Sequence, residues 1–205
     1  MMKNAVRRRL LAVLATACLA ATGGCANAVA FRGIDLLKRQ EAAVIAVPQV
    51  SQSRYFQCGY AALASVAVYY GIDMSALVSP EVVSQYSCRA LSAEQLAGMS
   101  RRLGLQAYAY EGSLDDLKAN VGKGRPLIAM LDGPPRTGRA LSGKWLNESL
   151  GAIAPEPHWV VVVGVLDGGR LLLHDPLNGC VAMAGSAFER AWGKKGNVCV
   201  LVTPA

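Results

Sequence analysis

A polar segment changes into an apolar one within the stretch Gln52-Ser53-Arg54-Tyr55-Phe56-Gln57-Cys58-Gly59-Tyr60-Ala61-Ala62-Leu63. From Ala61 to Tyr70 almost every residue is apolar, on all sides of a helical projection. This pattern is typical of a helix buried in the middle of a domain, and Gly71 is expected to end it. We therefore predict a central buried helix that carries Cys58 in its first turn.

The start of such a helix is a favourable place for a reactive thiol. The unpaired N–H groups and the helix dipole stabilise a thiolate and lower the pKa of the cysteine. Gly59 has no side chain, so a substrate backbone is expected to approach closely there, and Gln52 is expected to aim an amide donor at a developing oxyanion. Many free cysteines are only small buried apolar residues, but the polar approach, Gly59 and Gln52 favour a nucleophile.

The chain contains two histidines, and a predicted hairpin distinguishes them. His158 opens a valine-rich strand over residues 158–166, Asp167-Gly168-Gly169 is a turn signal, and residues 170–174 form the return strand. Residue 158 is then expected opposite residues 175–178, so Asp175 can reach the far nitrogen of His158. Taken alone, residues 175–179 are better explained as a plain turn, and it is their combination with Cys58, Gln52 and His158 that favours a catalytic role for Asp175. His174 is expected to be a structural or surface residue.

These motifs together resemble the bacteriocin-processing, double-glycine leader peptidases, family C39 of the papain-like cysteine peptidases. The resemblance is carried by Gln52, Cys58, Gly59, Ala61, Leu63, Tyr69-Tyr70-Gly71, His158 and Asp175-Pro176, and runs from about Val47 to the C-terminus. Gln57 stands where the family usually has Asp, and Tyr60 where it has a small residue. Both departures bear on substrate preference more than on the chemistry.

The resemblance implies a cysteine endopeptidase with Cys58 as nucleophile, His158 as general base and acid, Asp175 as its orienting group and Gln52 as oxyanion donor. The implied substrates are peptides or proteins. The known substrates of the family are leader peptides that end in Gly-Gly or Gly-Ala. Two alternatives stay open: an acyltransferase or amidase that uses the same thioester, and a non-catalytic peptide-binding lipoprotein on the same fold.

The remaining segments indicate an α+β fold with helices first and sheet second, as the papain-like architecture implies: a central Cys-bearing helix in an N-terminal helical part, packed on a C-terminal antiparallel sheet. Residues 132–157, rich in Gly and Pro, are either a loop bordering the cleft or a plain insertion. The other expected elements are helices near 80–86, 92–104, 113 onward and 186–192, and strands at 43–47, 105–110, 126–131, 180–184 and 197–202.

The first 24 residues have the pattern of an export signal. Lys3 and Arg7-Arg8-Arg9 precede an apolar run from Leu10 to Ala21, which is too short for a typical membrane span. Thr22-Gly23-Gly24-Cys25 resembles a lipobox, so we expect Cys25 to be lipidated and to anchor the protein at the periplasmic face of a bacterial membrane. Cleavage after Ala30 instead predicts a periplasmic or secreted protein.

Residues 25–43 are then a tether, and residues 44–205 a peptidase domain of sufficient length for one core.

The formal net charge of +7 falls to about +3 without the four signal cations (7 minus 4), so no nucleic-acid partner is expected. No paired Cys or His spacing suggests a metal, and no phosphate-binding glycine pattern suggests a cofactor. Oligomeric state is not predicted.

Three further cysteines, Cys88, Cys180 and Cys199, follow Cys58 in the chain. In an oxidising compartment one pair among them is plausible, and Cys180 and Cys199 are expected on neighbouring strands. The alternative is that all three are free and buried.

Overall fold

A computed structural model describes residues 43–52, 57–73, 90–135 and 157–205. The expected helix near 80–86, the export signal with Cys25, Cys88 and most of the 132–157 loop lie outside these residues. Residues 40–205 group into one compact unit. In the described part of the chain, no helix has both the length and the apolar character needed to cross a membrane.

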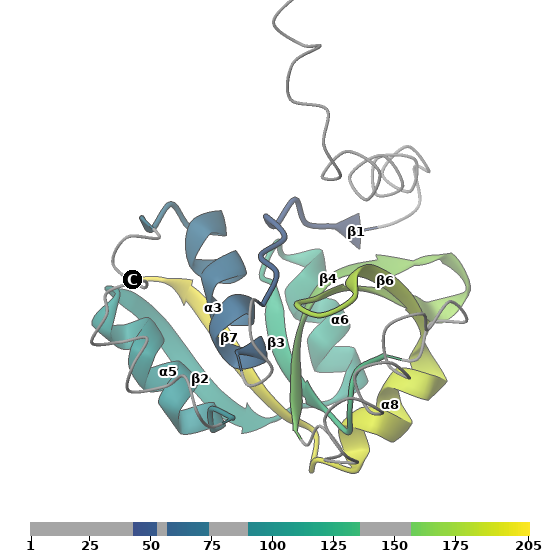
Figure 1. Ribbon diagram of the computed structural model, residues 1–205. Helices are drawn as coiled ribbons and strands as arrows, with labels where there is room; N and C mark the ends of the chain where they lie inside the picture. Colours follow the sequence, from purple (N-terminus) through teal and green to yellow (C-terminus); the bar gives the residue numbers. More distant parts are fainter. Residues whose placement is uncertain (1–42, 53–56, 74–89, 136–156) are drawn as a thin grey trace, which may run out of the picture. The chain divides into compact units, whose positions relative to one another are not determined.

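The unit is built on a seven-stranded sheet in which every neighbouring pair is antiparallel (Figure 1). The strand order is β2-β7-β3-β4-β5-β6, and β1 pairs with β4 beside this path. The strands are β1 (Ala43–Val44), β2 (Leu105–Glu111), β3 (Leu127–Leu131), β4 (His158–Leu166), β5 (Arg170–Asp175), β6 (Gly179–Ala184) and β7 (Val198–Pro204).

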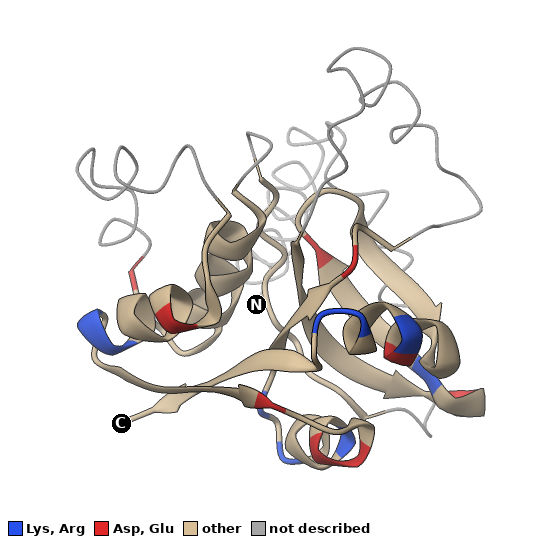
Figure 2. Cartoon of the chain, turned by 90° about the horizontal axis from the view of Figure 1, so that it is seen from below, with Lys and Arg blue, Asp and Glu red and all other residues tan. Residues whose placement is uncertain are grey.

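The helices pack against different parts of this sheet; they are α3 (Cys58–Tyr69), α5 (Ala93–Arg102), α6 (Leu114–Gly122) and α8 (Gly185–Gly193). Helix α3 packs mainly on β4, α5 on β2 and β7, and α6 on β4 and β1. Figures 1 and 2 place α3 and α5 on one face and α6 on the other. Because helices cover both faces, β4 is buried along almost its whole length.

Helix α3 is the predicted central helix. Nine of its residues are buried, from Cys58 to Ala67 with the exception of Tyr60, and Figure 2 shows no charged residue on it, unlike α5, α6 and α8. The chain leaves the helix at Gly71, which has a φ of 80°. The expected helix near 92–104 is α5, which begins with a capping box: Ser92 Oγ accepts from Gln95 N, and Gln95 Oε1 accepts from Ser92 N.

Two expectations about strands were wrong. Strand β1 ends at Val44 and not at Val47: Ile45 N still donates to Val163 O of β4 at 2.7 Å, but Val47 N donates to Ile45 O at 2.8 Å, and this tight turn takes the chain off the sheet. The strands of Cys180 and Cys199 are not neighbours, since β3, β4 and β5 lie between β6 and β7. A disulfide between these two cysteines is therefore excluded, and both thiols are free.

Candidate active site

Cys58 is the first residue of α3 and is 4% exposed. Its Sγ lies 4.0 Å from the carbonyl oxygen of Pro157, immediately before β4. Burial of the thiol opposes its ionisation, but a hydrogen bond with His158, the charge of that ring and the backbone of Trp159 and Gly59 lower the pKa of Cys58 overall. His158 is the largest of the favourable influences, and the backbone of Gly59, in the first turn of α3, is a smaller one.

His158 and Asp175 form a buried pair. His158 is the first residue of β4 and Asp175 the last of β5, and His158 Nε2 lies 2.7 Å from Asp175 Oδ1. Burial lowers the pKa of His158, but the hydrogen bond to Asp175 and the contact with Cys58 outweigh it and raise this pKa to about 9. Burial raises the pKa of Asp175, because it disfavours the charged carboxylate, but the hydrogen bond and charge of His158 lower it. The net result is a lowered pKa of Asp175.

The turn between β5 and β6 holds the carboxylate of Asp175 from both sides. Leu177 N donates to Oδ1 at 2.9 Å and Asn178 Nδ2 donates to Oδ2 at 2.6 Å. Such donors favour the ionised carboxylate. Residues 175–179 are thus both a turn and the support of a buried charge. Sequence reasoning did not identify Asn178, and its only signal was the common occurrence of Asn in turns.

The bonding of the ring fixes what it can do chemically. Since Nε2 is bonded to Asp175, Nδ1 is the ring nitrogen available to the Cys58 thiol. The lowered pKa of the thiol and the raised pKa of the imidazole favour a thiolate–imidazolium pair. A nucleophile, a base and an orienting carboxylate in this order can perform nucleophilic acyl transfer.

Gln52 lies beside the same turn. Its backbone N donates to Pro176 O at 2.9 Å, and the side chain of Gln49 donates to the backbone oxygen of Asp175 at 3.2 Å. The structure therefore brings the backbone of Gln52 to the residues that follow Asp175, while the chain continues through residues 53–56 to Cys58.

The reason for glycine at position 59 differs from the expected one. A Cβ atom on Gly59 would lie 2.9 Å from Trp159 Cδ1 and 3.4 Å from Leu91 Cβ. The indole is fixed there because Trp159 Nε1 donates to Leu91 O at 2.8 Å. Gly59 therefore serves the close packing of α3 on β4, and the space beside it is filled by Trp159 and not left for substrate.

His174 is placed apart from the Cys58–His158–Asp175 cluster by the strand register. It lies on β5 opposite Val161 and Cys180. Burial lowers the pKa of His174 to about 4, so its ring is neutral at physiological pH. Over the described ranges, no group of three or more His, Cys, Asp or Glu residues is arranged to hold a metal.

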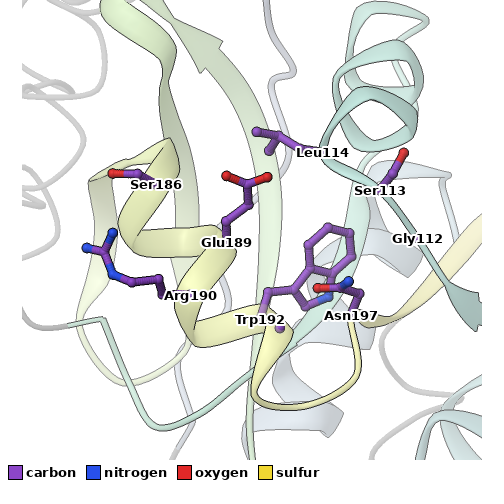
Figure 3. A pocket seen from close by; sticks show the side chains of 9 residues that line it. Gly112, Ser113, Leu114, Ser186, Glu189, Arg190, Trp192 and Asn197 are labelled. Atoms are coloured by element: carbon purple, nitrogen blue, oxygen red, sulfur yellow. The ribbon is translucent and has the colours of Figure 1, made fainter.

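A pocket of about 500 Å³ lies elsewhere, at the N-terminus of α6 and along α8. Figure 3 shows Ser113 and Leu114 from the α6 side and Glu189, Arg190 and Trp192 from α8. Its nine lining residues include none of the predicted site residues. The pocket is therefore separate from the candidate active site.

The chain matches one protein family over nearly all of the described unit. The profile of the Peptidase_C39 like family matches residues 44–200. No curated protein sequence matches the chain significantly.

Three solved structures have a similar fold. A double-glycine motif protease from an AMS/PCAT transporter, crystallised with a leader peptide, is 23% identical with a TM-score of 0.55, covering 79% of this chain and 94% of that chain. The peptidase domain of Streptococcus ComA, a bifunctional ABC transporter of a quorum-sensing pathway, is 20% identical with a TM-score of 0.55 (77% and 98% covered). A Bacillus anthracis protein described as a C39-like peptidase is 19% identical with a TM-score of 0.57 (79% and 98% covered).

At these identities the structural likeness shows the fold, and it confirms the expected α+β, papain-like arrangement of helices packed on an antiparallel sheet. The match to the family extends from β1 into β7 and includes Cys58, His158 and Asp175. The chain therefore belongs to the Peptidase C39-like family.

Proposed function

We propose that this protein is a cysteine endopeptidase that cleaves peptide bonds with Cys58 as nucleophile, His158 as general base and acid, and Asp175 as orienting carboxylate. The observation that carries the proposal is the buried hydrogen bond of 2.7 Å between His158 Nε2 and Asp175 Oδ1, together with the interaction of the same ring with the Cys58 thiol. Membership of a peptidase family supports the reaction class.

The proposed reaction has two halves. The Cys58 thiolate attacks the carbonyl carbon of the peptide bond, and Gln52 stabilises the resulting oxyanion. When the C–N bond breaks, the Nδ1 proton of His158 goes to the leaving amine and a thioester remains. Water then attacks the thioester while His158 takes its proton, and the C–S bond breaks to release the new carboxyl group and the Cys58 thiolate.

The proposed substrates are exported peptides or proteins. One structure of similar fold was crystallised with a leader peptide, and this supports an extended peptide as ligand. The signal-like residues 1–24 support export, with Cys25 as a lipid anchor at the periplasmic face of a bacterial membrane. Incorporation of labelled palmitate in the expressing cell, lost in Cys25→Ala, tests the anchor.

The enzyme proposal is tested with purified protein and peptides that contain Gly-Gly before the expected cut. Cys58→Ala should abolish cleavage, while Cys180→Ala, which removes another free thiol, should leave it intact. Mass spectrometry of the products locates the cut bond. Cleavage that survives in Cys58→Ala would refute the proposed mechanism.

A further inference from the structure

Ser65 is a buried hydroxyl in the middle of an apolar helix. It is 1% exposed, and apart from Cys58 the other buried residues of α3 are apolar or glycine. Its Oγ donates to Ala61 O at 3.1 Å and accepts from Val50 N at 3.1 Å. The first bond stays within the helix, but the second joins the helix to residues 49–52, which we call the strap.

The strap is fixed at both sides of the active site. On one side it is bonded to α3 through Ser65. On the other side Gln49 Nε2 donates to Asp175 O at 3.2 Å, and the strap's last residue, Gln52, donates its backbone N–H to Pro176 O at 2.9 Å. The strap therefore connects the helix that carries Cys58 with the turn that holds Asp175.

The position of Ser65 along α3 adds to this connection. It follows Cys58 by seven residues, which is close to two full turns, so both residues lie on the same side of the helix. The nucleophile and the anchor of the strap thus belong to one rigid element, and the proposed oxyanion donor Gln52 is two residues beyond the anchored Val50.

We propose that Ser65 is a positioning residue that fixes Gln52 relative to Cys58. This inference rests on the proposed peptidase function. Oxyanion stabilisation depends on donors held in place before the reaction, and a misplacement of about 1 Å can cost on the order of 10²-fold in rate. Without Ser65 the strap keeps its bonds to the Asp175–Pro176 backbone but loses its bond to α3.

Helix α5 offers a matched control. Ser100 is fully buried, and its Oγ donates to Leu96 O at 2.9 Å, which is the same i to i−4 bond that Ser65 makes. Within the described part of the chain, Ser100 accepts no hydrogen bond from another segment. Ser100→Ala therefore removes the bond within a helix, whereas Ser65→Ala also leaves the Val50 N–H without its acceptor.

The test separates attack by the thiol from stabilisation of the oxyanion. p-Nitrophenyl acetate acylates Cys58 through an oxyanion and needs no peptide recognition, whereas iodoacetamide alkylates a thiolate without forming one. We expect Ser65→Ala to slow Cys58-dependent acylation by about 10- to 100-fold and to leave the rate and pH midpoint of alkylation nearly unchanged. Ser100→Ala should change neither rate, and Cys58→Ala provides the background.

Each other result has a distinct meaning. Normal acylation in Ser65→Ala beside an active wild type overturns the inference alone, as does an equal fall in acylation and alkylation. Absence of Cys58-dependent acylation in the wild type overturns the proposed function and, with it, this inference. If Ser65→Ala does not fold, Val50→Pro removes the N–H donor without touching α3 and should reproduce the selective loss of acylation; normal acylation in that variant contradicts the inference.

Discussion

Two buried thiols, one at the start of helix α3 and one on strand β7, differ in pKa. Cys58 is 4% exposed and Cys199, on β7, is fully buried. The pKa of Cys58 is lowered, whereas burial and the charge of Asp116 raise the pKa of Cys199 to about 12, although its bonds with Tyr110 and Gly112 act in the other direction. Burial opposes ionisation at both places, and the difference comes from His158, whose hydrogen bond and charge lower the pKa of Cys58.

The neighbours of Cys199 form a structural network. Its Sγ donates to the backbone oxygen of Tyr110 at 3.4 Å, and the Tyr110 hydroxyl donates to Asp116 on α6. Burial together with this carboxylate raises the pKa of Tyr110. The carboxylate of Asp116 thus opposes ionisation of Cys199, whereas the carboxylate of Asp175 raises the pKa of His158, which in turn lowers that of Cys58.

The largest effect on activity is expected from removing the Cys58 thiol, and almost none from removing the Cys199 thiol. Cys58→Ala should reduce peptide cleavage by at least about 10⁴-fold, because the covalent step is lost. Cys199→Ala should leave kcat unchanged within about twofold and lower only stability, by about 1 kcal/mol, since it removes one buried sulfur. Steady-state kinetics measure the activity and urea unfolding the stability of both variants. Loss of activity in Cys199→Ala would contradict the expected difference between the two thiols.

The next largest effect is expected from neutralising Asp175, and none on the pH profile from neutralising Asp116. Asp175→Asn removes the charge that raises the pKa of His158, so the turnover rate should fall by roughly 10²- to 10⁴-fold. The basic limb of its pH profile should also move to lower pH. Asp116→Asn, near Cys199, should leave the profile unchanged. Initial rates measured across the pH range test this pair, and a basic limb unmoved in Asp175→Asn would argue against its role.

The pH profile of the wild type should be bell-shaped. A thiolate exists only above the lowered pKa of Cys58, and the imidazolium only below the pKa of His158 at about 9. Activity should therefore rise from acid, hold through neutral pH and fall as the pH passes about 9. A rate that keeps rising above this value would show that protonated His158 is not required.

A smaller effect concerns how closely α3 approaches β4. Gly59→Ala should destabilise the protein by about 1–3 kcal/mol, because the new Cβ meets Trp159. It should also raise the pKa of Cys58 by moving the thiol from His158. Gly98→Ala on α5 has nothing within 4 Å of its Cβ and should stabilise by up to about 1 kcal/mol. Urea midpoints and alkylation profiles of Gly59→Ala and Gly98→Ala measure these effects. Equal changes in stability and in the pKa of Cys58 in both variants would contradict a close contact of Gly59 with Trp159.

Local patterns in the sequence predicted the features that depend on nearby residues. The apolar run after Cys58 indicated a helix buried on all sides, and Asp167-Gly168-Gly169 placed the turn that brings Asp175 to His158. Both depend on hydrophobic periodicity and turn chemistry, which are local properties.

Features that depend on distant contacts were not predictable in this way. The packing of Gly59 on Trp159 joins residues 100 positions apart, and the strand order that separates Cys180 from Cys199 is a property of the whole sheet. Ser65 was visible only as a polar residue in an apolar run; its partner Val50 lies across a polar segment that gives no register.

We infer that His158 keeps Cys58 ionised inside a buried site. The most direct test is the rate of iodoacetamide alkylation of folded protein against pH, with modified cysteines located by mass spectrometry and Cys199 as internal comparison. We expect Cys58 to react rapidly below neutral pH, Cys199 to remain unmodified, and His158→Ala to slow Cys58 strongly in that range. Reaction of wild-type Cys58 only near the ordinary thiol pKa of about 8.5, unchanged in His158→Ala, would contradict the account.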